Sequence, residues 1–170
     1  MKLLLPILAL LASALLTHAA DEAKPDADAV FREPFTLKLH VDKEHFYEEE
    51  FGKIPYVHSG AVYLFKDDEF GLTLEIQDNT IRSVKYQKDV TKADVTLKFS
   101  QDAEPDKTGM ILRIQNKTKH RLNLDALMTI PGREGILKTS ILPVEPGLFG
   151  FESWPHPIVQ LVLRNIRIAQ

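Results

Sequence analysis

Apolar and polar residues alternate along several short runs of the chain. In the run 35–41, FTLKLHV, every second residue is apolar. The same alternation occurs in FGLTLEI (70–76), DVTLKF (94–99), MILRI (110–114), RLNL (121–124) and IVQLVL (158–163). A period of two is typical of strands that bury one face, so we expect a β-strand in each run.

Helical periodicity is weak throughout. The best helix candidate is KEHFYEEEF (43–51), where Tyr47 and Phe51 lie four positions apart, and it would span only about two turns. Many short strands without intervening helices indicate antiparallel sheets. We predict an all-β fold, an immunoglobulin-like antiparallel β-sandwich of about seven to nine strands, with an open β-barrel as the alternative.

Two segments of the chain resemble each other. GLTLEIQDNTIRSVKY (71–86) and GMILRIQNKTKHRLNL (109–124) align without a gap, and both predict a strand, a polar turn and a second strand. Two explanations stay open, convergence on a common hairpin sequence and duplication of one hairpin.

The first twenty residues have the three parts of a secretory signal peptide. Lys2 precedes an apolar stretch, and small residues at Ala19 and Ala20 offer a cleavage site. The apolar stretch is shorter than a bilayer-spanning helix, which needs about 20 residues. We therefore expect a signal-peptide helix over 1–20, a flexible linker over 21–34 and a single domain over 35–170, with no membrane span after cleavage.

Composition narrows the location and the partners. The chain has no cysteine, which together with export favours the bacterial periplasm, or else secretion. Lys and Arg number 21 against 24 Asp and Glu, and no basic stripe is present, so nucleic-acid binding has no electrostatic support.

Catalytic motifs are missing from the sequence. A nucleophile elbow and a phosphate-binding glycine loop are both absent, and Ser59 beside His58 cannot form a nucleophile–base pair on an extended chain. Asp125 and Glu152 each adjoin apolar residues, which could raise a carboxyl pKa, but nothing in the sequence brings them together. We predict that the protein is not an enzyme and needs no cofactor.

Half of the aromatic residues lie between positions 46 and 70. They either fill the core or line a binding groove, and Tyr47, Tyr56 and Tyr63 are the candidate binding residues because a phenol combines an apolar ring with a polar tip. Tyr63 belongs to AVYLF (61–65), which is apolar on both faces of a strand.

The stretch FESWPHPIV (151–159) holds the only tryptophan, Trp154, and the two prolines that follow it, Pro155 and Pro157, exclude a central strand there. It is either a rigid recognition loop, with Trp154 as anchor and Glu152 and His156 as polar contacts, or a corner where Trp154 caps the core and Glu152 bonds a neighbouring turn.

Metal binding has only weak candidates. His40, His45 and Glu44 are near one another in the chain, but the two histidines point to opposite faces of a continuous strand unless a turn intervenes. We therefore predict no metal site.

These observations favour an exported, non-enzymatic binding module of the bacterial cell envelope whose partner is another envelope protein. A periplasmic carrier of a small apolar ligand or a metal is the alternative, and an envelope hydrolase is a third, less favoured hypothesis.

Overall fold

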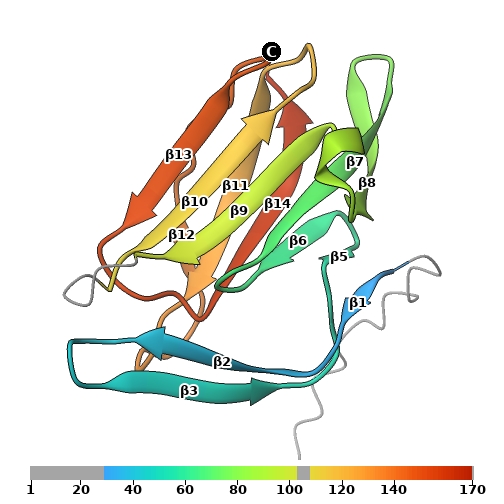
Figure 1. Cartoon of the computed structure of the whole chain (residues 1–170). Helices are drawn as coiled ribbons and strands as arrows, with labels where there is room; N and C mark the ends of the chain where they lie inside the picture. The colour runs from blue at the N-terminus through green and yellow to red at the C-terminus, as the bar shows by residue number, and fades with distance from the viewer. Residues whose placement is uncertain (1–28, 103–107, 170) are drawn as a thin grey trace, which may run out of the picture.

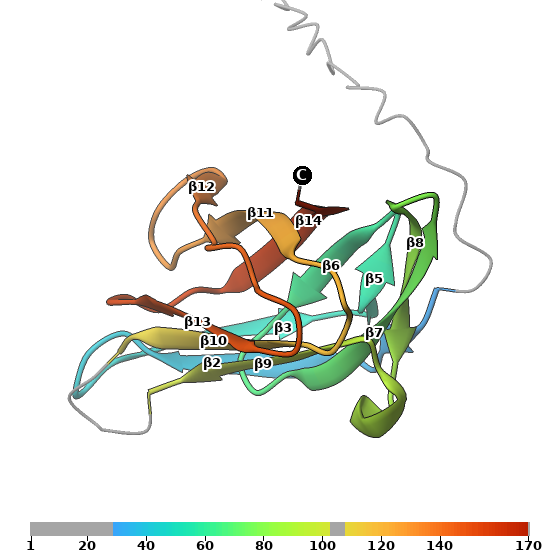
Figure 2. The ribbon, with the colours of Figure 1, turned by 90° about the horizontal axis from the view of Figure 1, so that it is seen from above.

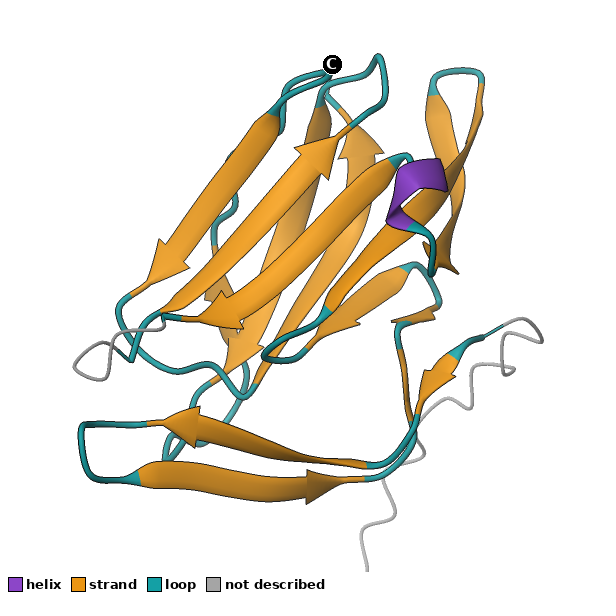
Figure 3. Cartoon of the chain, in the orientation of Figure 1, coloured by secondary structure: helices purple, strands orange, loops and turns teal. Residues whose placement is uncertain are grey.

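The computed structural model describes residues 29–102 and 108–169. Within these ranges the regular structure is almost entirely β, and the one helical element is a short 3-10 turn, η1 (Val90–Lys92) (Figure 3). The expected signal-peptide helix lies outside the described residues, as do residues 21–28 of the expected linker.

Ten strands form two five-stranded antiparallel sheets. One sheet has the order β13 (Phe149–Trp154), β10 (Met110–Asn116), β9 (Val95–Gln101), β7 (Glu69–Gln77) and β8 (Thr80–Gln87). The other has the order β12 (Leu137–Thr139), β11 (Leu122–Thr129), β14 (Gln160–Ile168), β6 (Ala61–Leu64) and β5 (Val57–His58). The sheets face each other as two layers (Figures 1 and 2), and in the described ranges no pairing joins their edges into a closed barrel.

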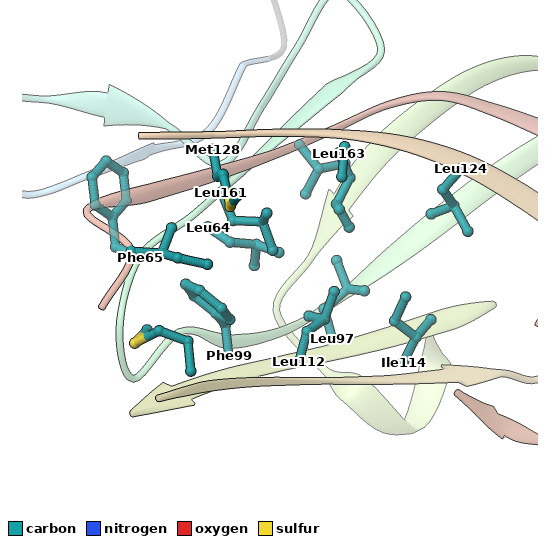
Figure 4. Packing of buried hydrophobic residues seen from close by; sticks show 14 of the residues in the cluster. Leu64, Phe65, Leu97, Phe99, Leu112, Ile114, Leu124, Met128, Leu161 and Leu163 are labelled. Atoms are coloured by element: carbon teal, nitrogen blue, oxygen red, sulfur yellow. The ribbon is translucent and has the colours of Figure 1, made fainter. Parts of the chain in front are cut away.

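The core lies between the two layers. Alternate residues of each strand point inward, as the period-two runs predict, so that β9 and β10 bury every second side chain, and β14 does so as far as Leu163. Figure 4 shows leucines of both sheets meeting across the interface, with Phe99 and Phe65 filling one end. Because the chain has no cysteine, this buried apolar surface replaces disulfides as the source of stability.

A separate hairpin crosses one end of the two sheets (Figure 1). It consists of β2 (Phe35–His40) and β3 (Phe46–Phe51), paired along their whole length. The helix candidate at 43–51 is therefore wrong for residues 46–51, which form β3. Strand pairing overrides the weak helical spacing because Phe51 stacks on Phe35 across the hairpin, with ring centroids 5.4 Å apart.

Strand pairing extends to residues before Phe35. Strand β1 (Phe31–Arg32) pairs with β4 (Ile54–Pro55), so residues 31–32, which the sequence assigns to the linker, belong to the fold. The reason is the Arg32 side chain, which is 7% exposed and enters the protein interior.

The two similar segments fold differently. Residues 71–86 form a hairpin, β7–β8, whose turn places Asp78 and Asn79 at positive φ, as a two-residue hairpin turn requires. Residues 109–124 instead run from β10 in one sheet to β11 in the other. Asn116, in the place of Asp78, is fully buried and donates to the carbonyl oxygens of His120 and Val144. The expectation of a second hairpin is wrong, because this amide fastens a crossover between sheets.

A buried ion pair joins the N-terminal residues to the two sheets. The Arg32 guanidinium donates to the Asp68 carboxylate at 2.8 Å and to the Tyr63 carbonyl oxygen at 3.0 Å. It also lies over the rings of Tyr56 and Phe65, 4.3 and 4.9 Å from their centroids. Desolvation raises the pKa of Asp68 above its ordinary value, against the opposing effect of Arg32.

The other end of the hairpin is held by one amide. Gln101, 8% exposed, accepts from the His40 backbone N–H at 2.9 Å and donates to the His40 carbonyl oxygen at 2.8 Å. These two bonds reproduce the pattern of a backbone bridge, so the tip of β2 is fixed to the end of β9.

Replacing Arg32 with Met leaves Asp68 buried without its cation. We expect Arg32→Met to lower the free energy of unfolding by about 3–5 kcal/mol near pH 7. A carboxyl whose folded pKa is raised contributes stability below its unfolded pKa and loses that contribution as the pH rises through the folded pKa. Loss of the cation raises the pKa of Asp68 further, so the deficit of the variant should narrow as the pH falls toward 3.8.

Urea denaturation near neutral pH and at about pH 4.5 measures this difference. The double variant Arg32→Met/Asp68→Asn is the control, and it should recover part of the lost stability because no buried charge remains unpaired. Equal deficits at both pH values, with no recovery in the double variant, would contradict the ion-pair interpretation.

Candidate functional site

Trp154 is a core residue. It ends β13 with 7% of its surface exposed, meets Phe99 edge to face at 6.3 Å, and donates from Nε1 to the Thr139 hydroxyl at 2.9 Å. Thr139 belongs to β12 of the opposite sheet, so the indole bridges the two layers. Its burial selects the corner interpretation of the stretch 151–159 over the recognition loop.

The rest of that stretch fits a corner as well. Glu152 accepts from the Leu142 backbone N–H at 2.6 Å, which ties β13 to the connection before it. His156 is half-buried in the passage from β13 in one sheet to β14 in the other, and its Nδ1 has no hydrogen-bond partner among the described residues.

The three tyrosines do not share a site. Tyr56 stacks on Tyr86 at 4.3 Å beside Arg32, and Tyr63 is half-buried on β6. Tyr47 lies on the hairpin and donates to Glu49, and desolvation together with this bond raises the pKa of Tyr47 to about 12. It lines a cleft with Phe51 and the β11–β12 turn, and none of the other five candidate binding residues lines that cleft.

The weak metal candidates are also dispersed. His45 is exposed and bonds Asp42 through Nδ1 at 2.8–2.9 Å, whereas His40 packs its ring against Phe46. Glu44 uses its backbone N–H to bond the same Asp42 carboxylate. In residues 29–102 and 108–169, no three His, Asp or Glu side chains are arranged to hold a metal ion.

The carboxylates considered for hydrolysis lie on different sheets. Asp125, on β11, accepts from Asn165 and Arg167, and these bonds lower its pKa. The expectation that apolar neighbours raise this pKa is therefore wrong for Asp125, because the residue faces solvent and cationic side chains. Glu152 is on β13, where it bonds a backbone amide.

An exposed aromatic surface on β13 is the main feature that sequence reasoning missed. Phe149 and Phe151 are 50% and 64% exposed, and they point to the outer face of the sheet with Ile111 of the neighbouring strand. We call these three residues the β13 face. Arg113 covers one side of it, with its guanidinium 5.7 Å from the Phe149 ring centroid. The signal was present in LFGFESW, where aromatic residues occupy every second position on the face opposite Trp154.

The backbone of β13 is open along the same strand. The Asn116 N–H donates to the Leu148 carbonyl oxygen. This bond and the register of the two strands show which residues of β13 have backbone groups that point toward β10. Because antiparallel pairing alternates, every second residue from Leu148 bonds β10. Phe149, Phe151 and Ser153 therefore direct their N–H and C=O groups away from β10, and no second strand pairs there in the described part of the chain.

A lateral groove lies where β8 approaches β14 and the β5–β6 turn. Its cavity volume is about 780 Å³. We call it the β8 groove; its apolar lining consists of Ala29, Val30, Val57, Ala61, Ile81, Val84 and Ile166. Arg82, Lys85 and Arg164 also line it, and no acidic residue does.

Comparisons with protein families, with curated proteins and with solved structures found no match. No helix among the described residues has the length and apolar character that crossing a bilayer requires.

Truncating the buried indole tests its structural role. We expect Trp154→Ala to lower the free energy of unfolding by about 3–5 kcal/mol, because it leaves a cavity and removes the bond to Thr139. Trp154→Phe should lower the free energy of unfolding by roughly half as much, since an aromatic ring still fills most of the site. Denaturation followed by circular dichroism measures both, and a parent-like midpoint for Trp154→Ala would exclude the core role.

Proposed function

We propose that the protein is an exported, non-enzymatic binding module of the bacterial cell envelope that engages a partner protein through the β13 face. The observation that carries this proposal is the coincidence of exposed aromatic side chains and an unpaired strand edge on β13. Main-chain groups of an edge strand supply affinity for an added strand, and side chains at alternate positions supply specificity. Aromatic residues, phenylalanine included, are also enriched at the centres of protein interfaces.

The architecture fits this role. Two antiparallel sheets pack over one core, as they do in immunoglobulin-like sandwiches. The immunoglobulin-like interpretation of the fold is an analogy that rests on this two-layer arrangement. Such sandwiches serve many functions, so the residues of the β13 face, and not the fold, indicate what this protein does. The partner is expected to be another envelope protein in the periplasm, because the N-terminal residues have the pattern of a signal peptide.

Export can be tested directly. We expect the protein recovered from the periplasm of an expressing bacterium to have an intact mass that corresponds to cleavage after Ala19 or Ala20. Cytoplasmic protein that retains Met1 and Lys2 would contradict the proposed location.

Interaction through β13 is tested by placing a photo-crosslinking amino acid at position 151 in living cells. We expect a defined adduct with one envelope protein. Phe151→Ser in the chain that carries the crosslinker at position 149 should reduce the yield by about tenfold, which is the effect of losing an aromatic interface centre.

Ile136→Ser is the matched control. Ile136 is 67% exposed in the turn between β11 and β12, so its replacement removes a similar exposed apolar group away from β13. The crosslinking yield should then equal that of the parent. Equal losses in both variants, at unchanged thermal stability, would contradict a specific β13 site.

A second candidate function is that of a periplasmic small-ligand carrier. The β8 groove favours it, since an apolar lining beside polar groups in a cavity of a few hundred Å³ or more is typical of small-molecule sites.

A further inference from the structure

We infer that the β8 groove binds an anionic amphiphile, a molecule with an acyl or similar apolar body and one acidic head group. This inference gives the second candidate function its ligand class, and it does not depend on the β13 face. It rests on the charge, the lining and the unsatisfied donor of the groove.

The charge of the lining is one-sided. The chain as a whole is acidic, with a net charge of −3, yet the side chains that line the groove include three cations and no carboxylate. Arg82 is exposed and lines the groove. A cluster of one charge sign in a concave site raises the local concentration of the opposite charge, which selects an anion.

Strand geometry places the apolar and cationic groups together. Val84 pairs with the buried Leu74, so its side chain points inward toward the space between the layers. The register of β7 and β8 shifts after Glu75, and this bulge places Arg82 between the inward-facing Ile81 and the next paired residue, Ser83. The bulge therefore puts a guanidinium at the margin of an apolar wall.

Arg164 supplies the third observation. It lies on β14 one residue before Asn165, whose positive φ marks a second irregularity, and its Nε is buried without a hydrogen-bond partner among the described residues. Asp125 is opposite Arg164 in the β11–β14 register, and the charge of Arg164 helps to lower the pKa of Asp125. The Asp125 carboxylate accepts its hydrogen bonds from Asn165 and Arg167, however, and not from Arg164. A buried donor without a partner is costly, and an acidic head group would satisfy it.

Calorimetric titration with laurate, below the concentration at which it forms micelles, tests the inference. We expect saturable binding of one molecule per chain. Dodecanol, which has the same apolar body and no charge, should bind about tenfold more weakly, and acetate, which has only the head group, should not bind measurably.

Two charge reversals localise the site. Arg82→Glu should weaken laurate binding by about tenfold or more, because it places a carboxylate at the margin of the groove. Arg133→Glu is the matched control, since Arg133 is also an exposed arginine but lines the cleft beside Tyr47 instead. It should bind laurate as the parent does. Thermal unfolding of both variants should match the parent.

Two outcomes would overturn the inference. The first is an absence of saturable laurate binding, and the second is equal binding by Arg82→Glu and Arg133→Glu. Phe151→Ser should leave laurate binding unchanged, so failure of the groove and failure of the β13 face are distinguishable.

Discussion

The fold depends on how Arg32 enters the interior. Asp68 holds the guanidinium and also accepts from the Phe65 backbone N–H, while its own carbonyl oxygen accepts from Phe99 on β9. One residue thus fixes the N-terminal strand, the turn between β6 and β7 and the end of a central strand. A buried ion pair contributes little net stability compared with an apolar pair, but it excludes arrangements in which either charge lacks its partner. The position of the hairpin therefore follows from electrostatics as much as from packing.

The period-two runs located five of the ten strands that form the two layers, because burial of one face imposes alternation directly on the sequence. Strands that do not bury a regular apolar face were harder to predict from the sequence. The hairpin strand β3 carries three consecutive glutamates that face solvent, and β13 has glycine and glutamate on its inner face, so neither shows regular alternation. Asn116 could not be distinguished from Asp78 by its neighbours, since only the partner across the protein decides between a hairpin and a crossover.

Trp154, the only tryptophan, was the most conspicuous candidate binding residue in the sequence. Trp154 stood out in composition, but Pro155 and Pro157, which follow it and lack a backbone donor, belong to the corner between the sheets, and the indole lies inside. Phe149 and Phe151 are common residue types and did not stand out in the sequence. They became candidates for binding because the structure shows them exposed on an edge strand. The β8 groove was beyond sequence reasoning altogether, since its cations come from Arg82 and Arg164 on opposite sheets, brought together by two irregular strands.

The amide of Gln101 also constrains the order of folding. It contacts His40 across 61 positions of the chain, and Arg32 reaches Asp68 across 36. The β2–β3 hairpin can pair locally, yet its docking contacts do not exist until β9 is in place, and closing such long loops is entropically costly. The hairpin is thus among the last parts of the fold to reach its final position, and until it docks its Leu37 and Leu39 side chains are not buried against the sheets.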